Sequence, residues 1–424
     1  MEAKKPYLFV FIVYIANLLG SIYYYIFGRN FYSFNVGYIL NSLTAEEKEY
    51  VMNDNVILEN LNRISVDLAA VKKPLSFSGE YFMTRGFIEQ IKNRVAFENY
   101  LKQNPDILNV KIKDPVFFIT LPRTGSTFLH CLLKEDPSWF APRIWMQKSH
   151  FPSPSNPYSE KDMEIINKNR DEVIYFQSLT DWNVLSKAHL VSERDPEDLL
   201  IQLEPLGINA AASWLFGMED YNKFIATLPL EKWSEVMKKL KVMFQCLMKN
   251  YPSTRLLSMS HIFCVNVESI YETFPDAKFV IIHRDPVKSV SSLSSLVRSL
   301  RKLWYNGETE KESYSYFTRI NGEISYQMDK YLKFRTKMEE MGKSDLFVDV
   351  SFKNLVKDPI ACVQDLYGKL GKKWTKEAEE KLKYFIENQT EHKTASHKYK
   401  ITEDMQNYTK DLFKSYCERF KEFL

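Results

Sequence analysis

The sequence PVFFITLPRTGSTFLHCLL, residues 115–133, decides the fold. Its apolar run Phe117–Ile119 is typical of a parallel strand that is covered on both faces. Pro122 ends the strand because proline has no N–H to give to a neighbouring strand. Gly125 permits a sharp turn, and the Ser and Thr that follow it suit the first turn of a helix. A strand, a loop of small residues and a helix are therefore predicted at the centre of the fold.

A loop between a strand and a helix N-terminus is a natural anion site. The first N–H groups of a helix have no partner within the helix, and the helix dipole favours negative charge there. Arg123 adds a fixed positive charge. The loop is not a Walker A loop, because it has a single Gly and no Lys before the hydroxyls. Taken alone, an ordinary strand-to-helix turn explains this stretch as well as an anion site does.

Composition narrows the class of protein. The chain has 424 residues, of which 45% are hydrophobic and 26% charged, which is ordinary for one large globular domain with insertions or for two domains. The net charge is only +3, so there is no overall bias toward nucleic acid. The five cysteines have no CxxC spacing, which argues against a metal site and a disulfide framework. The sequence does not exclude a single disulfide bond.

The N-terminal part contains an uncharged apolar run, residues 7–27, that is long enough to cross a bilayer. Basic residues on both sides of it favour, by a small margin, a cytosolic tail over residues 1–6. We expect a single-pass signal anchor, with the rest of the chain in the lumen of the Golgi or endoplasmic reticulum. A buried core helix and a cleaved signal peptide are the alternatives. The N-glycosylation motifs Asn-x-Thr at Asn388 and Asn407 fit a glycoprotein whose domain lies in the lumen.

The remaining pattern alternates strands with helices. Residues 28–109 are predicted to form a helical N-terminal region, and residues 110–424 the main domain with a helical substrate-side insertion at 163–250. Further strands are predicted at Arg255–Met259, Ala277–His283 and Leu346–Val350. Such alternation predicts a parallel sheet with helices on both faces. The predicted fold is α/β: a P-loop-like three-layer α/β/α domain with a central parallel sheet, helical insertions and an N-terminal transmembrane helix.

A second motif begins with Arg284, directly after the strand predicted over residues 277–283, and has Ser292 eight residues later. Side chains at the carboxyl end of a parallel strand lie at the edge where doubly wound folds bind ligands. A guanidinium and a hydroxyl together suit a phosphate monoester. The alternative is an Arg–Asp pair that closes the turn.

Together, the two motifs resemble those of the sulfotransferase family. The loop LPRTGST, residues 121–127, is similar to the family's 5′-phosphosulfate loop, and Arg284 with Ser292 is similar to its 3′-phosphate motif. One branch of the family reads LPRTGTT and then FPDAKFVxxHRDPxxxVxSxxSLxxxLR. Here, residues 274–301 read FPDAKFVIIHRDPVKSVSSLSSLVRSLR. The resemblance extends over residues 55–415.

The resemblance implies a sulfotransferase that uses 3′-phosphoadenosine 5′-phosphosulfate (PAPS) and no metal. The acceptor would be a hydroxyl or amine of a small molecule, lipid or glycan. Arg123 would also be catalytic, by neutralising charge that builds up on the leaving group. Residues that would hold the donor are Arg123, Thr124, Gly125, Ser126 and Thr127 at the 5′ end, and Arg284, Ser292, His397 and Tyr399 at the 3′ side.

The acceptor needs a general base, and His189 is the candidate. It begins the family-like pattern HLVSERDPED, residues 189–198, in which acidic residues follow the histidine. A nearby carboxylate can orient an imidazole and raise its proton affinity. His130, Glu193 and Asp198 are the alternatives.

Two positions depart from the family branch. Relatives often have Trp-Glu after the loop helix, where this chain has Trp145-Met146. They also often have LKSPxH where this chain has LLSMSH, which puts Leu257 in the place of a lysine. These departures keep open a second function, a donor-binding scaffold with impaired catalysis. A nucleoside-phosphate kinase is disfavoured because Gly-Lys-Ser/Thr is missing.

Overall fold

The computed structural model covers nearly the whole chain. The described residues are 6–30, 34–70, 75–179, 191–251, 254–262, 264–301, 304–305, 310–388 and 401–424. The predicted site residues His189, His397 and Tyr399 lie outside these ranges. All five cysteines are within them and are free thiols.

Five parallel strands form one sheet in the described part of the chain, in the order β2-β3-β1-β4-β5. Their bounds are β1 (Val116–Thr120), β2 (Trp139–Phe140), β3 (Arg255–His261), β4 (Lys278–His283) and β5 (Phe347–Ser351). The strands predicted from the apolar runs are confirmed, and the two-residue edge strand β2 is an addition. Every residue of β1 is buried, as a central strand covered on both faces requires.

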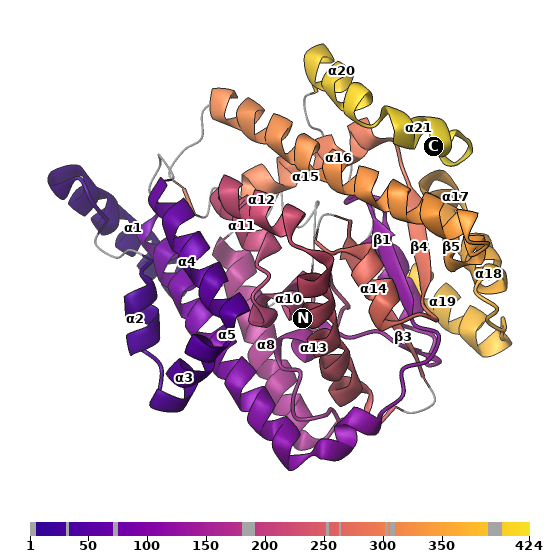
Figure 1. The fold of residues 1–424 in the computed structure, drawn as a ribbon, viewed down its shortest axis with the longest axis horizontal. Coiled ribbons are helices and arrows are strands. Elements are labelled where there is room, and N and C mark those ends of the chain that lie inside the picture. Colours follow the sequence, from indigo (N-terminus) through magenta and orange to yellow (C-terminus); the bar gives the residue numbers. More distant parts are fainter. Residues whose placement is uncertain are drawn as a thin grey trace.

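Successive side chains of the strands divide the core into two layers. Phe118 of β1 packs with Leu257 and Ile282 on one face, whereas Phe117 packs with Phe279 on the other. The first face is covered by α6 (Ser126–Leu133), α17 (Phe352–Lys357), α18 (Pro359–Lys369) and α19 (Lys376–Asn388). The second is covered by α13 (Leu230–Met248), α14 (Val267–Thr273), α15 (Pro286–Arg301) and α16 (Glu310–Glu340). The predicted three-layer α/β/α fold is therefore confirmed (Figure 1).

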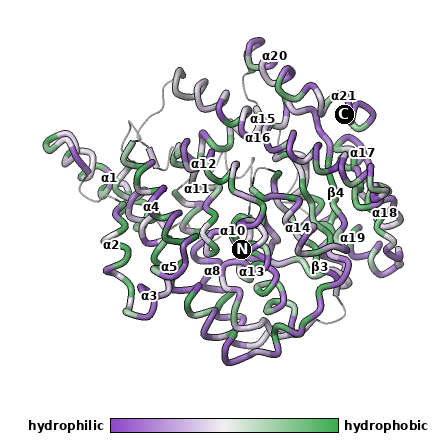
Figure 2. Tube along the Cα trace, viewed as in Figure 1, coloured by the Kyte–Doolittle hydropathy of each residue, from purple (hydrophilic) through white to green (hydrophobic). Residues whose placement is uncertain are grey.

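Further helices extend the second layer away from the sheet, on the left of Figure 1. In the N-terminal region these are α2 (Val36–Asn41), α3 (Ala45–Asn53), α4 (Asn55–Ala70), α5 (Phe77–Gln103) and the 3₁₀ helix η1 (Pro105–Asn109). The central part adds α7 (Ile144–Lys148), α8 (Glu160–Leu179), α10 (Leu200–Leu203), η2 (Glu204–Leu206), α11 (Ala210–Phe216) and α12 (Glu219–Thr227). Hydropathy colouring shows hydrophobic residues along the strands of the sheet and hydrophobic and hydrophilic residues interleaved along the surrounding helices (Figure 2).

The C-terminal part of the chain returns to the sheet. After η3 (Ser344–Leu346) and β5, the chain passes through α17 to α19 and ends in α20 (Glu403–Leu412), α21 (Lys414–Arg419) and η4 (Lys421–Phe423). Both α20 and α21 contact α16, and η4 contacts β5. The end of the chain therefore lies against the carboxyl ends of β4 and β5 (Figure 1).

The predicted membrane-spanning run is a single helix, α1 (Tyr7–Phe27), which can cross a bilayer by its length and composition. None of its residues is buried. One side of it rests on the domain, because the Asn17 side-chain oxygen accepts the N–H of Ser78 at 2.9 Å and the ring of Phe9 lies 4.7 Å from that of Tyr175.

Candidate functional site

The loop after β1 is a tight turn at the carboxyl edge of the sheet. Arg123 and Gly125 both have positive φ, 61° and 79°. A Cβ on Gly125 would lie 3.3 Å from the ring of Phe352, so this position needs glycine for space as well as for conformation. The hydroxyl of Thr124 donates to the carbonyl of Leu121 at 2.9 Å, which holds the turn in shape.

Helix α6 presents its N-terminus to this loop, as the sequence predicts. Gly125 is the N-cap and supplies no side-chain cap, and Ser126 and Thr127 begin the helix. The N–H groups of the first turn and the positive end of the helix dipole therefore point toward the carboxyl edge of the sheet. This is the arrangement that binds sulfate, phosphate or carboxylate groups at helix termini.

The structure brings the two sequence motifs into contact. Nε of Arg123 donates to Oγ of Ser292 at 3.3 Å, although 169 positions separate the two residues. Arg284 donates through Nη1 to the backbone carbonyl of Arg123, and Ser289 donates to the carbonyl of Pro122. The start of α15 therefore holds the loop from one side.

Arg284 lies directly after β4 and is partly buried. Its guanidinium stacks over the ring of Phe352, with 4.3 Å from Cζ to the ring centroid. Stacking and the bond to the Arg123 carbonyl restrict its rotamers, so the charge is held in place before a ligand binds. Arg123, Arg284 and Ser292 thus form one cationic, hydroxyl-bearing group at the edge of the sheet.

Below Arg284, a buried polar network fixes the end of β4. Asp349 takes two bonds from Arg335, both at 2.7 Å, and contacts Nε2 of His283 at 2.7 Å. Nδ1 of His283 contacts the hydroxyl of Tyr416 at 3.0 Å. Burial lowers the pKa of His283, so its imidazole is neutral near pH 7.

An oriented imidazole lies on the other side of the loop. His261 ends β3 and is the register partner of Thr120, which ends β1. Its Nδ1 contacts the carboxylate of Asp198, which also accepts the backbone N–H groups of His261 and Leu200 at 2.9 Å each. The side chain of Asp198 is 1% exposed and that of His261 is 17% exposed. Asp198 therefore fixes an imidazole that still reaches solvent.

The sequence reading missed His261 as a chemical group and used it only to align a motif. The available signal was that His261 follows the apolar run 255–259, because residues at the carboxyl end of a parallel strand lie at the edge that binds ligands. His130 and Glu193, the alternative candidates for the general base, have other surroundings. His130 is fully buried, which lowers its pKa to about 4, and Glu193 pairs with Arg170 at 3.2 Å.

The two departures from the family pattern lie away from the loop. Leu257 is fully buried and is the register partner of Val116, at the start of β1. Since a strand rises by about 3.3 Å per residue, Leu257 lies roughly 13 Å before His261. Leu257 is therefore a core residue of β3 and lies away from the loop. Met146 is 2% exposed and packs in the core.

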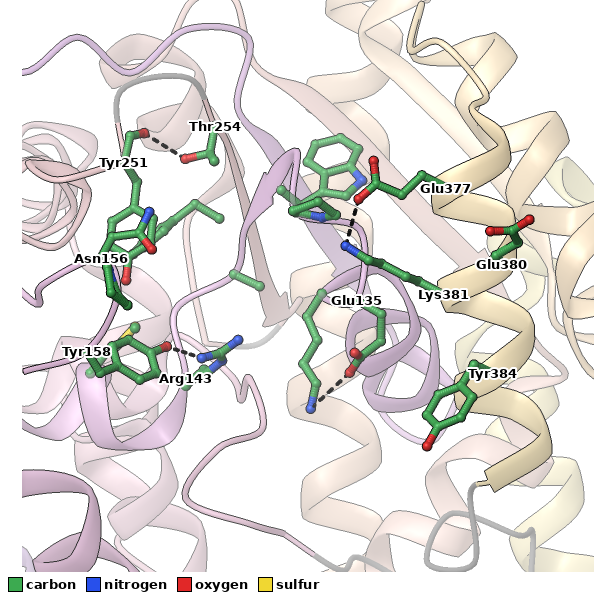
Figure 3. A pocket seen from close by; sticks show the side chains of 17 residues that line it. Glu135, Arg143, Asn156, Tyr158, Tyr251, Thr254, Glu377, Glu380, Lys381 and Tyr384 are labelled. Carbon is green, nitrogen blue, oxygen red and sulfur yellow. Dashed lines mark hydrogen bonds and ion pairs between the residues drawn. The ribbon is translucent and has the colours of Figure 1, made fainter. Parts of the chain in front are cut away.

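A cavity of about 850 Å³ lies beside β2, at a different place from the loop. Figure 3 shows Tyr158 and Tyr251 on one side of it and Glu377 and Lys381 of α19 on the other. β2 pairs with the first residues of β3, at the opposite end from His261. None of the predicted site residues within the described ranges lines this cavity, so it is not the predicted anion site.

Cation-ligating residues do not gather at the loop either. Among the residues that the structure describes, no group of three or more His, Cys, Asp or Glu side chains could hold a metal ion. The groups present at the edge are guanidinium, hydroxyl and backbone N–H groups, which are donors for anions.

Comparisons with known proteins agree with this geometry. The model of the sulfotransferase family matches residues 115–376, which include both motifs. The structure of sulfotransferase STF9 from Mycobacterium avium has a TM-score of 0.74 at 16% identity and covers 91% of this chain and 96% of its own. Sulfotransferase STF1 from Mycobacterium tuberculosis H37Rv gives 0.71 at 18% identity, with 90% and 98% covered. No curated protein sequence matches the chain.

Proposed function

The chain belongs to the sulfotransferase family, and we propose that it moves the sulfuryl group of PAPS to a hydroxyl or amine of an acceptor. The contact between Arg123 and Ser292 carries this proposal. It joins the helix N-terminus that suits a 5′-phosphosulfate to the Arg284 group that suits a 3′-phosphate. PAPS is anionic at both of these ends, and the edge of the sheet offers donors at two matching places.

In this proposal each residue of the edge has one role. The N–H groups at the start of α6, with Thr124, Ser126 and Thr127, bind the 5′ end. Arg284 and Ser292 bind the 3′-phosphate, and His397 and Tyr399 remain proposed contacts on that side. Arg123 stabilises the charge that develops on the oxygen between phosphorus and sulfur. Sulfuryl transfer then depends mainly on positioning and charge stabilisation, as phosphoryl transfer does.

The acceptor must lose a proton as the bond from its oxygen or nitrogen to sulfur forms and the bond from sulfur to the 5′-phosphate oxygen breaks. We propose two histidines that could take this proton. His189 is the candidate from the sequence pattern. His261 is supported by its contact with Asp198 and by its place beside Thr120, because a fixed carboxylate orients an imidazole for proton transfer.

We also propose that α1 attaches the enzyme to the Golgi or endoplasmic reticulum membrane, with the domain in the lumen. Its length and apolar composition support attachment. Of the two glycosylation triplets, Asn388 is the exposed last residue of α19. Asn407 is exposed on α20, but Thr409 of the same triplet is fully buried. Asn388 is therefore the better supported acceptor.

One experiment separates the enzyme from a scaffold with the same fold. The full chain is incubated with PAPS and a panel of alcohols, sterols, glycans and tyrosyl peptides, and binding of 3′,5′-adenosine bisphosphate is measured in parallel. We expect binding together with sulfation of at least one acceptor class. Binding without transfer on the whole panel would favour the scaffold, and absence of binding would refute both functions.

A further inference from the structure

Helix α1 packs on the domain by one of its faces. The side chains on this face recur at helical spacing, and all of them are half-buried: Phe9, Val13, Asn17 and Gly20. They lie against α5 and α8. On the other side of α1, the side chains of Leu8, Phe11 and Leu19 are 60–72% exposed. Docking on the domain therefore leaves a wide apolar face of α1 uncovered.

The central contact of the docked face is made by Asn17, the middle residue of the apolar run 7–27. Its side-chain oxygen accepts the N–H of Ser78 at 2.9 Å. Ser78 is in the first turn of α5, where backbone N–H groups have no partner within their own helix. The contact therefore satisfies a polar side chain of α1 and an N-terminal N–H group of α5 at the same time.

Close packing lies on both sides of this hydrogen bond. A Cβ on Gly20 would lie 2.8 Å from Cβ of Phe77, so a larger residue at this position would push α1 away from α5. Toward the other end of α1, the ring of Phe9 lies 4.7 Å from that of Tyr175 and 6.4 Å from that of Phe82. More than half of the length of α1 therefore rests on the domain.

The docked position differs from that of a helix that crosses a bilayer and carries the domain beyond its C-terminal end. The part that rests on the domain is the N-terminal part, whereas residues 24–27, which lead toward α2, are exposed. To cross the bilayer, α1 would have to leave α5. Asn17 would then lie near the centre of the hydrocarbon without the N–H of Ser78, and an unsatisfied polar group at that depth is costly.

Exposed tyrosines of the domain lie next to α1. Tyr175 packs against Phe9, and the ring of Tyr81 lies 5.6 Å from that of Phe82; both tyrosines are exposed. Tyrosine is enriched where a membrane meets water, because its ring is apolar and its hydroxyl is polar. Charged surface begins one turn later on α5, with an exposed Arg85. The uncovered side of α1, Tyr81 and Tyr175 together are called the membrane face below.

We propose that α1 attaches the protein to one leaflet of a lipid bilayer while it stays docked on α5, and does not cross the bilayer. Acyl chains cover the apolar side of α1, and Tyr81 and Tyr175 lie at the level of the headgroups. This inference rests on the proposed membrane attachment and not on the proposed reaction. Because docking holds α1 along the domain, residues 1–6 and the domain lie on the same side of the membrane.

Topology in sealed microsomes tests this arrangement. The full chain carries one epitope tag before Met1 and another after Leu424, and protease is added from outside. On chains that resist extraction with alkaline carbonate, we expect both tags to be protected or both to be digested. Protection of one tag with digestion of the other, or loss of the first tag by cleavage of α1, would overturn the inference. If carbonate releases the chain, the proposed membrane attachment itself has failed.

Two substitutions should release α1 from the domain. Asn17→Leu removes the bond to Ser78, and Gly20→Leu adds a side chain where Phe77 leaves no room. In each variant we expect the two tags to lie on opposite sides of the membrane in most chains. Ser21→Leu is the matched control, because it adds the same side chain at an exposed position of α1 and should leave both tags on one side. An equal shift in Ser21→Leu, or no shift in either docking variant, would overturn the inference.

Lipid labelling maps the membrane face directly. A photoactivatable phosphatidylcholine in the same membranes should label α1 and the peptides that contain Tyr81 and Tyr175. The control is the peptide with Tyr384, an exposed tyrosine of α19 on the opposite side of the molecule, which should stay unlabelled (Figure 1). Labelling confined to α1 would overturn the inference. Cross-linking of two chains through α1 without lipid labelling would overturn it too, because a second copy would then cover this face.

Discussion

Arg123 and Ser292 are in contact at 3.3 Å across the carboxyl edge of the sheet. One comes from the loop after β1 and the other from the second turn of α15. Their contact brings the two motifs that we propose to bind anions together at one place. A ligand with anionic groups at both ends would meet Arg123 in the middle and Arg284 at one end.

The first prediction concerns Arg284. Arg284→Ala should weaken binding of 3′,5′-adenosine bisphosphate at least a hundredfold by calorimetry, because a charge-assisted, preorganised contact to the 3′-phosphate is lost. Arg298→Ala removes an exposed arginine from α15, the helix that follows Arg284, and should leave the affinity unchanged. Unaltered binding in Arg284→Ala would refute the assignment of the 3′ side.

The second prediction identifies the general base. The variant that lacks it should lose a factor of about 10² to 10⁴ in kcat while donor affinity stays nearly constant. We therefore expect such a loss in either His261→Ala or His189→Ala, and a smaller loss in Asp198→Asn if His261 is the base. If both alanine variants retain wild-type turnover, the proton goes to another group.

The third prediction concerns the loop glycine. Gly125→Ala combines a positive φ with a Cβ 3.3 Å from Phe352, and should lower the free energy of unfolding by about 1–3 kcal/mol and weaken donor binding. Gly342→Ala is the matched control, because it has a φ of 75° but open space around the new Cβ. Equal effects of the two substitutions on donor binding would show that the contact with Phe352 has no role.

The fourth prediction is a pH dependence of stability that originates at Glu80. This side chain is 7% exposed, and burial raises its pKa to about 7, while the amide of Asn30, which donates to it at 2.6 Å, opposes the shift. The folded state then holds the proton more tightly than the unfolded state does. The contribution to stability is complete below about pH 4.5 and is lost as the pH rises toward 7.

Glu80→Gln should therefore be more stable than the wild type at pH 8, by up to about 3 kcal/mol, and similar to it near pH 4.5. Chemical denaturation at the two pH values measures this difference. Glu89→Gln changes an exposed, ion-paired carboxylate of the same helix and should show little pH dependence. A Glu80→Gln variant that follows the wild-type pH profile would argue against a raised pKa.

Local pattern was sufficient for much of the fold. The apolar runs at 117–119 and 277–283 are typical of buried strands, and Pro122 and Gly125 mark where the first of them ends. The helices after Asn266 and Asp285 follow from capping and spacing. β2 was not predicted because a strand of two residues is too short to show an alternation of apolar and polar residues. It forms by pairing with the start of β3.

Features of the site that lie within one short segment could be predicted from the sequence. Contacts between residues far apart in the chain could not. Loop composition and an arginine after a strand are each local features of the sequence, and they favour anion binding when the two motifs are taken together. The pairing of His261 with Asp198 was not predicted, because 63 positions separate them and their contact depends on the strand order. The motif around Leu257 likewise did not predict its place in the fold. Leu257 is buried in the core and pairs with Val116 of β1, which depends on the order of the strands.

The sequence by itself determined the strand, the glycine turn, the helix N-terminus and the two arginines, because each follows from the conformational and charge properties of neighbouring residues. Only the tertiary structure decided that Arg123 meets Ser292, that His261 faces Asp198 and that Tyr416 contacts His283. These contacts join segments far apart in the chain. They exist because packing of the parallel sheet aligns the carboxyl ends of β1, β3 and β4 at one edge.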